Sequence, residues 1–241
     1  VGGWVRKGTA GYTGRVTVPD PAVFAGEALA FALREAGLQL DGRVRTAAPG
    51  DLASRDGWSM LAERRVPLRE ALAVMLKESH NMYAEQVIKT VGAEREGDGS
   101  WKGGLTCGAR LLQSLQFRAG DMALADGSGM SRHNRLCPAL ICAVLVEAER
   151  SDWGGALPDL LAAAGREGTM RRRFREAEYR DRIRAKTGYL RGVGALSGYA
   201  DTRSGTRVAF SILINDFRGG GNWAMKQIED KIARAIIDHA E

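Results

Sequence analysis

The chain has 241 residues, of which 44% are hydrophobic and 27% are charged, and this is the composition of a globular protein with a sizeable core. No apolar run approaches the roughly 18–20 residues that a membrane-spanning helix needs, so we expect no transmembrane segment. No signal peptide opens the chain, which begins at Val1, as a processed or truncated product would. The three histidines and three cysteines have no metal-ligand spacing, which argues against a metal site.

Positive charge is in excess and is concentrated in one stretch. The net charge is +6, and residues 171–184 hold seven arginines against three acidic residues. Such a stretch is typical of a solvated surface, or of a surface that attracts an anionic polymer such as cell wall. Because no nucleic-acid-binding motif accompanies it, we expect no nucleic-acid partner.

The first third of the chain predicts short extended segments around one helix. Residues 1–18 place Val, Trp and Tyr among Gly and Thr, a pattern that favours edge strands or the tail of an upstream accessory region. Asp20 and Pro21 predict the N-cap and first position of a helix, and Gly37 predicts its end. A short strand is expected at 44–47, and a second helix from Pro67 to about Ser79.

The rest of the chain changes from helical to strand patterns. Apolar periodicity predicts helices at 82–90, 105–117, 138–149 and 223–236, and strands at 183–187, 193–200 and 207–214. The short links between the strands suit antiparallel hairpins. The expected order is a helical block, three sequential strands and a closing helix.

Two short motifs point to a chemistry. Lys186-Thr187-Gly188 follows Ser79-His80-Asn81 by 107 residues. A K-T-G downstream of an S-x-N makes up two thirds of the motif set of penicillin-recognising serine acyl-enzymes. The third motif, S-x-x-K, carries the nucleophile, and none of the eleven serines has Lys three residues later. The chain therefore predicts a large part of an active site without its attacking group.

The K-T-G segment supplies what acyl transfer needs around the nucleophile. Lys186 on a strand would be a fixed positive charge, and Thr187 would offer its hydroxyl to a substrate carboxylate. Gly188 would let the backbone approach the substrate closely, and the backbone N–H of Tyr189 would be one oxyanion donor. Taken alone, a K-T-G triplet is also typical of a strand end.

The S-x-N motif lies where two predicted helices meet. Ser79 would relay a proton between the nucleophile and Lys186, and Asn81 would hydrogen-bond a substrate amide; taken alone, the motif is also typical of helix capping. Between the two motifs, a turn-rich loop contains Asp126, Ser128 and Gly129. Taken alone, this loop is typical of a plain tight turn.

Four segments in this order resemble the class C low-molecular-mass penicillin-binding proteins, a family of D-Ala-D-Ala carboxypeptidases and endopeptidases. They are DPAVFAGEALAFALREAGLQLDG at 20–42, SHNMYAEQVIK at 79–89, DGSGMSRHNRL at 126–136 and GTMRRRF…RIRAKTGYLRGVGALSGYA at 168–200. The resemblance covers roughly residues 15–240 and implies that 19–241 form the C-terminal part of the catalytic domain. It implies an α+β penicillin-binding/β-lactamase-like transpeptidase fold, a helical block plus an antiparallel sheet that lacks its N-terminal strands.

The resemblance also implies an activity. It implies a serine acyl-enzyme mechanism on peptidoglycan stem peptides ending in D-Ala-D-Ala, in the periplasm or cell envelope, with no metal and no organic cofactor. β-Lactam antibiotics would acylate the enzyme. The resemblance assigns catalytic roles to Ser79, Asn81 and Lys186. It assigns substrate binding to Thr187, Gly188 and Tyr189. It assigns support of the cleft loop to Asp126, Ser128 and Gly129.

The chain departs from the family in two respects. Tyr189 stands where the family often has Thr. The S-x-x-K motif and the first strands of the sheet belong to an N-terminal region that is absent here, so we expect the isolated chain to be inactive without an N-terminal chain that carries S-x-x-K. We also expect an unpaired sheet edge at 207–214 and self-association or instability. Loss of apolar cover is expected at Val208, Phe210, Ile212 and Ile214.

Other functions are consistent with parts of the pattern. A non-catalytic peptidoglycan- or penicillin-binding module could hold a carboxylate through Lys186 and Thr187 without turnover. A Ser-Lys hydrolase could use Ser79 itself as the nucleophile, although the resemblance places Ser79 beside that position. The choice between carboxypeptidase and endopeptidase stays open.

Overall fold

The computed structural model describes residues 8, 17–48, 56–57, 59–60 and 62–240, and the chain divides into two compact units, Val1–Arg64 and Arg65–Glu241. Most of the edge strands predicted at 1–18 lie outside the described residues. Gly8, Thr17 and Val18 are described and are not in strands.

The first unit contains helix α1 (Pro21–Glu35). Its start follows the prediction, because Asp20 Oδ1 accepts a hydrogen bond of 3.0 Å from the N–H of Val23. Gly37, with φ +87°, follows its end. The strand predicted at 44–47 is wrong: these residues form no strand and join no sheet of the described residues. Val44 packs instead on α1, where a Cβ at Gly26 would lie 2.4 Å from Val44 Cγ1.

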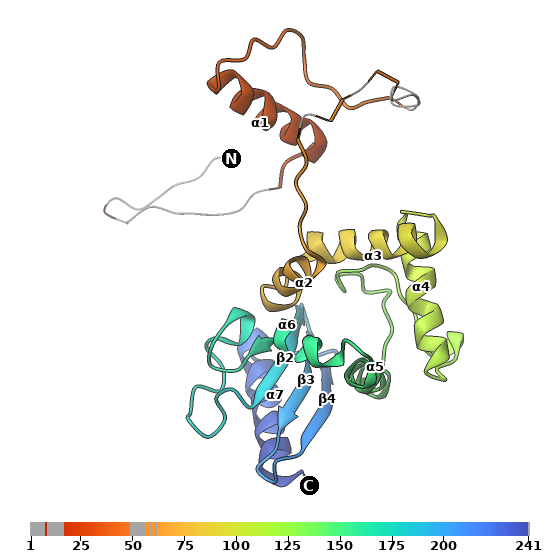
Figure 1. Cartoon of the computed structure of the whole chain (residues 1–241). Helices are drawn as coiled ribbons and strands as arrows, with labels where there is room; N and C mark the ends of the chain where they lie inside the picture. The colour runs from red at the N-terminus through yellow and green to blue at the C-terminus, as the bar shows by residue number, and fades with distance from the viewer. Residues whose placement is uncertain (1–7, 9–16, 49–55, 58, 61, 241) are drawn as a thin grey trace. The chain divides into compact units, whose positions relative to one another are not determined.

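The second unit begins with helices and ends with a sheet and a long helix (Figure 1). The helices are α2 (Leu68–Lys77), α3 (Asn81–Glu96), α4 (Trp101–Ser114), α5 (Pro138–Arg150), the short α6 (Leu157–Leu160) and α7 (Gly221–His239). Short 3-10 helices lie at Ala119–Asp121, Gly154–Ala156 and Gly168–Met170. Sequence periodicity predicted every helix of this unit except α6 and the 3-10 turns, which are too short to carry a periodic signal.

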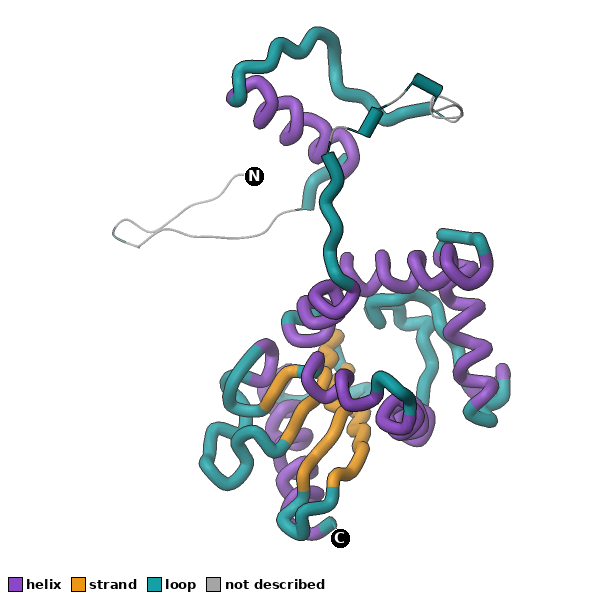
Figure 2. Tube along the Cα trace, viewed as in Figure 1, coloured by secondary structure: helices purple, strands orange, loops and turns teal. Residues whose placement is uncertain are grey.

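The sheet is antiparallel and has the strand order β1-β2-β3-β4 (orange in Figure 2). Its strands are β1 (Ala162–Ala163), β2 (Ile183–Leu190), β3 (Val193–Asp201) and β4 (Arg207–Ile214). The β2–β3 register pairs Lys186 with Ser197 and Gly188 with Ala195. The predicted hairpins are confirmed; the two-residue strand β1 was not predicted.

Two apolar layers cover the sheet, one on each face. On one face, α7 contributes Ala233 and Ile237 to a core with Leu196 and Phe210. On the other face, Leu145 of α5 packs with Tyr199 and other residues of a second cluster. Figure 1 shows α7 along one face of the strands and α5 and α6 toward the other. The sheet, which contains β2 and its K-T-G motif, is therefore packed on both faces.

The cover predicted to be missing on β4 is present. Phe210 and Ile212 are 4% and 8% exposed, and Val208 and Ile214 pack against the same core. The prediction was wrong because it treated the edge and the face of the sheet as one. These side chains point to the face that α7 covers, and a missing neighbour strand would leave only the backbone groups along the edge of β4 unpaired. Such an edge is seen: within the described residues, β4 pairs only with β3.

Candidate active site

The two motifs meet in space. Lys186 Nζ donates a hydrogen bond of 2.6 Å to Ser79 Oγ and another of 2.6 Å to the carbonyl oxygen of Thr187. Burial lowers the pKa of the Lys186 ammonium to about 8, because desolvation disfavours its charged form. At neutral pH this lysine is thus charged but close to releasing its proton.

Ser79 sits in a constrained turn between α2 and α3. Its φ is +55°, a left-handed conformation that side chains other than Asn, Asp and Gly adopt infrequently. The turn ends α2 at Lys77 and lets Asn81 start α3. Strained backbone of this kind is found preferentially at functional sites, and here it presents Ser79 and Asn81 to the same cavity.

Glu85, one turn after Asn81 on α3, ties the predicted loop to the S-x-N helix. Its carboxylate accepts hydrogen bonds from the backbone N–H groups of Gly127 (3.1 Å) and Ser128 (2.9 Å) and from Trp101 Nε1 (2.8 Å). Burial acts to raise the pKa of this carboxyl, but the hydrogen bonds together outweigh it and the pKa is lowered. Sequence reasoning missed Glu85, although its i+4 spacing from Asn81 places it on the same helix face.

Asp126 organises the loop from within. Its carboxylate accepts hydrogen bonds from the backbone of Gly129 (2.8 Å) and Ser131 (2.6 Å) and from Asn134 Nδ2 (2.8 Å). Burial opposes ionisation, yet these donors leave the pKa of Asp126 lowered. Asp126 and Gly129 hold the loop's shape, while Ser128 lines the cavity beside Ser79.

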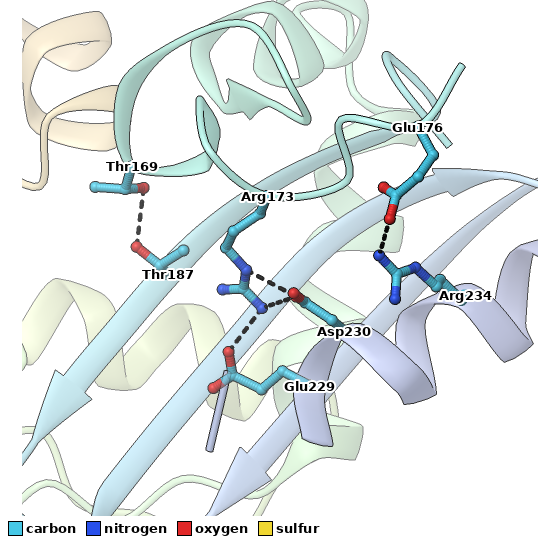
Figure 3. Close-up of polar contacts among 7 residues, drawn as sticks. All are labelled: Thr169, Arg173, Glu176, Thr187, Glu229, Asp230 and Arg234. Atoms are coloured by element: carbon cyan, nitrogen blue, oxygen red, sulfur yellow. Dashed lines mark hydrogen bonds and ion pairs between the residues drawn. The ribbon is translucent and has the colours of Figure 1, made fainter. Parts of the chain in front are cut away.

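The remaining K-T-G residues lie along β2. Thr187 Oγ1 donates a hydrogen bond of 2.9 Å to Thr169 Oγ1 (Figure 3), a partner that sequence reasoning missed. Gly188 is exposed, and a Cβ there would lie 3.1 Å from Ala195 Cβ, so the site is tight for a side chain. Tyr189 is half exposed, at 50%.

Two cavities adjoin these residues. One, of about 100 Å³, is lined by residues that include Ser79, Asn81, Ser128 and Lys186. The other, of about 440 Å³, is lined by residues that include Ser79, Asn81, Thr187, Gly188 and Tyr189. All predicted site residues except Asp126 and Gly129 therefore line one cavity or the other.

A buried ion cluster borders the larger cavity. Arg173 donates to Asp230 Oδ1 through Nε (2.8 Å) and to Glu229 Oε2 through Nη2 (2.9 Å), and Figure 3 shows both carboxylates on α7. The three side chains are 7%, 11% and 3% exposed for Arg173, Asp230 and Glu229. Burial raises the pKa of Glu229, and the charge of Arg173 only partly offsets this effect. At Arg173 the arginine-rich stretch thus departs from the solvated surface that the sequence predicted.

The described residues contain no cluster of three or more His, Cys, Asp or Glu side chains that could hold a metal ion. Within the same residues, no helix is both long and apolar enough to cross a membrane.

The chain is similar to a set of carboxypeptidases. The family model of the D-Ala-D-Ala carboxypeptidase 3 (S13) family matches residues 1–237. A D-alanyl-D-alanine carboxypeptidase of Actinomadura sp. (strain R39) is 32% identical over 230 residues, which are 93% of this chain and 42% of that protein. The carboxypeptidase DacB of Mycolicibacterium smegmatis is 30% identical over 212 residues, 86% of this chain and 45% of that protein.

A solved structure has a similar fold. Penicillin binding protein 4 (dacB) from Haemophilus influenzae, complexed with a β-lactam, matches with a TM-score of 0.76 and 26% identity over 92% of this chain and 52% of that one. This match confirms the predicted α+β, penicillin-binding fold. The chain spans less than half the length of the two carboxypeptidases above, at 42% and 45%.

Proposed function

Because this chain belongs to the D-Ala-D-Ala carboxypeptidase 3 (S13) family, as the four resembling segments predicted, we propose that it supplies the S-x-N and K-T-G parts of a serine D,D-peptidase that cleaves peptidoglycan stem peptides through an acyl-enzyme. The observation that carries the proposal is the 2.6 Å contact between Lys186 Nζ and Ser79 Oγ, made across 107 residues of sequence. It is the contact that a proton relay between the two motifs requires.

In this proposal Lys186 and Ser79 move the proton of the nucleophile. A lysine with a pKa of about 8 lies near the operating pH, where general acid–base catalysis is most effective. Ser79 Oγ accepts a hydrogen bond from Lys186 Nζ, and both residues line the small cavity, so together they could pass a proton from an attacking hydroxyl to the leaving amine. Asn81, which lines both cavities, would hold a substrate amide.

The K-T-G strand would position the substrate. Thr187 and Gly188 line the larger cavity, and the absence of a side chain at Gly188 would let an extended peptide approach the strand backbone closely. The backbone N–H of Tyr189 would donate to the developing oxyanion. Asp126, Ser128 and Gly129 would keep their loop against the cavity through the hydrogen bonds to Asp126 and Glu85.

The attacking serine would come from a chain segment outside this sequence. None of the eleven serines begins an S-x-x-K, and the small cavity beside Ser79 and Lys186 offers space for a nucleophile from another segment. That segment would also pair with the free edge of β4. We propose that the complete enzyme acts outside the cytoplasm on D-Ala-D-Ala termini, that β-lactams acylate it, and that the isolated chain is inactive and tends to self-associate.

The test is the rate of acylation by a fluorescent penicillin, measured on a longer chain that carries S-x-x-K upstream of residue 1. Ser79→Ala and Lys186→Ala should each slow acylation by about 10²- to 10⁴-fold, the usual effect of a general acid–base group. Matched controls are Ser204→Ala and Lys231→Ala, which change the same side chains away from both cavities. Unchanged rates in the Ser79 and Lys186 variants would refute the relay.

Reversible penicillin binding to the 241-residue chain, with no acylation of any longer chain, would instead identify a non-catalytic binding module. Acylation of Ser79 itself would identify a Ser-Lys hydrolase that uses this residue as its nucleophile.

A further inference from the structure

The loop of residues 164–182, which connects β1 and β2, holds most of the arginine-rich stretch (teal, beside β2 in Figure 1). Its exposed arginines that form no ion pair with any described residue are Arg171, Arg172, Arg175 and Arg180. Exposed charges are usually set against opposite charges nearby. These four side chains therefore form a concentration of positive charge that needs an explanation.

The carboxylates of the loop do not neutralise these arginines, because most of them already have other partners. The existing pairs are Glu167 with Lys77, Glu176 with Arg234, and Asp181 with Arg166. Among the described residues of the loop, Glu178 is the only carboxylate without an ion pair. The loop therefore keeps a net positive charge at its surface.

Polar contacts with α7 hold this loop in one conformation. The contacts join Arg173 to Glu229 and Asp230, Glu176 to Arg234, and Tyr179 to Asp238. Figure 3 shows the first two of them reaching from the loop to the helix. A ligand that binds to a surface already held in place loses less free energy to ordering than one that binds a floppy loop. The arginines are thus presented on a preorganised segment.

The four arginines are neighbours in space as well as in sequence. Arg175 and Arg180 flank Gly165, where a Cβ would lie 3.5 Å from Arg175 Cα and 3.1 Å from Arg180 Cγ. The N–H of Gly165 also donates a hydrogen bond of 3.2 Å to the carbonyl oxygen of Met170, the residue before Arg171. A single extended anion could therefore contact several of these side chains together.

The loop also forms part of the wall of the larger cavity. Thr169 lines that cavity and shares a hydrogen bond with Thr187 of the K-T-G motif. Arg171 and Arg172 follow Thr169 by two and three residues in the chain, but neither of them lines a cavity. A ligand held by these arginines would therefore lie beside the cavity without filling it.

The choice of cation points to phosphate. Residues 164–182 contain no lysine, and all of their basic side chains are arginines. A guanidinium binds a phosphate group through two parallel N–H hydrogen bonds, whereas a lysine ammonium acts as a point charge. Several arginines on one short segment suit an anion that repeats along a chain, because each contact releases a counterion from the polymer.

The large apolar side chains of the loop are not available to a ligand. Met170 and Phe174 are 0% and 2% exposed, and the half-buried Tyr179 donates its hydroxyl proton to Asp238. Single-stranded nucleic acids are usually held by stacking of their bases on exposed aromatic rings. Binding in a membrane interface usually needs an apolar face that inserts. The loop therefore fits a water-soluble phosphodiester chain without bases better than either of these partners.

We propose that Arg171, Arg172, Arg175 and Arg180 form a binding surface for a polyol phosphate polymer, in which phosphodiesters link small polyhydroxyl units. Each guanidinium contacts a phosphate of the polymer, and the contacts with α7 hold the loop in position. Because none of the four side chains lines either cavity, the polymer and a cavity ligand bind at the same time. The surface holds the chain on a polymer-bearing structure, and this binding does not rest on the proposed function.

The experiment is a titration of a fluorescently labelled glycerol phosphate polymer with the 241-residue chain, followed by fluorescence anisotropy. Four contacts predict that affinity falls by about 50-fold when the salt concentration increases from about 50 to 200 mM, since the logarithmic slope is about −0.7 for each neutralised phosphate of a single chain. Polyglutamate and a single-stranded oligonucleotide of equal charge, and vesicles of phosphatidylglycerol and phosphatidylcholine, are measured in parallel. We expect the polyol phosphate to bind most tightly.

The double variant Arg175→Gln/Arg180→Gln should weaken binding of the polymer by about 30-fold, or about fivefold for each charge removed near an anionic surface. Its matched control is Arg95→Gln/Arg118→Gln, which removes the same charge from two exposed arginines outside the loop that form no ion pair with a described residue. The control should bind nearly as the unaltered chain does.

Equal losses of affinity in the two double variants would overturn the proposal, because they would mean attraction by overall charge alone. Tighter binding of polyglutamate would overturn the recognition of phosphate. Tighter binding of the oligonucleotide or of the vesicles would assign the surface to nucleic acid or to a membrane instead. Because this titration needs no nucleophile and no cavity ligand, its outcome is separate from that of the penicillin acylation test.

Discussion

Replacing Arg173 by Met should destabilise the second unit strongly. The substitution leaves the carboxylates of Glu229 and Asp230, 3% and 11% exposed, without their shared partner. Removing one member of a buried ion pair typically costs about 3–5 kcal/mol, a large share of the ~5–15 kcal/mol that stabilises a domain. For a unit of this size, a loss of that order lowers the melting temperature by roughly 6–20 °C.

The loss of folding free energy in Arg173→Met should depend on pH. Burial raises the pKa of Glu229 in the folded chain, and Arg173 opposes this rise; without Arg173 the pKa rises further. A carboxyl whose folded pKa is raised adds stability below its unfolded value of about 4.5 and loses it as the pH increases through the folded value. The Arg173→Met deficit should therefore be largest at pH 7 and shrink toward pH 5.

The assay is urea unfolding followed by circular dichroism at both pH values. Arg172→Met is the control, because it makes the same substitution one residue away, at an exposed position. A deficit below about 1 kcal/mol at pH 7, or one equal at pH 7 and pH 5, would refute the reasoning that the three charges form one buried cluster.

Three further predictions concern the loop, the sheet and Lys186. Glu85→Gln leaves one acceptor oxygen for the two backbone donors that now bond to separate carboxylate oxygens. It should lower the free energy of unfolding by about 1–3 kcal/mol and speed hydrogen exchange at Gly127 and Ser128. Unchanged exchange at these two amides would contradict this prediction. Gly198→Ala places a Cβ against the Arg184 carbonyl oxygen, so it should lower the free energy of unfolding in urea by about 1–3 kcal/mol. Gly155→Ala, where a Cβ has no atom within 4 Å, should change it little. Equal losses in the two variants would disprove the clash. Because burial lowers the folded pKa of Lys186 from 10.5 to about 8, stability should increase between pH 8 and 10.5, and this increase should disappear in Lys186→Met; the same slope in both chains would exclude the shift.

The sequence predicted the parts of the fold that local pattern controls. The strands around 183–214 alternate on a period of two, and their short links favour antiparallel hairpins. All three strands were therefore predicted, although β2 ends at Leu190 rather than at 187. The approach of Lys186 to Ser79 came from paired motifs and their order. The helix start at Asp20 came from capping chemistry.

What escaped sequence analysis depends on contacts between distant segments. Arg173 lies in a run of arginines that the sequence does not distinguish from one another. It is buried because it pairs with Glu229 and Asp230 of α7, which lie 56 and 57 residues further along the chain. Glu85 is an ordinary helix residue until the loop at Gly127 and Ser128 folds onto it. The cover of β4 was mispredicted because a sheet has two faces as well as edges, and α7 covers the face that the apolar side chains occupy.

We propose above that this chain contributes the S-x-N and K-T-G parts of a serine acyl-enzyme. The direct measurement is intact-mass spectrometry with peptide mapping after incubation with a penicillin, performed on the 241-residue chain and on a longer chain that carries S-x-x-K upstream. We expect no adduct on the 241-residue chain and one penicilloyl adduct on the longer chain, at the serine of S-x-x-K. An adduct on any of the eleven serines of residues 1–241 would contradict it.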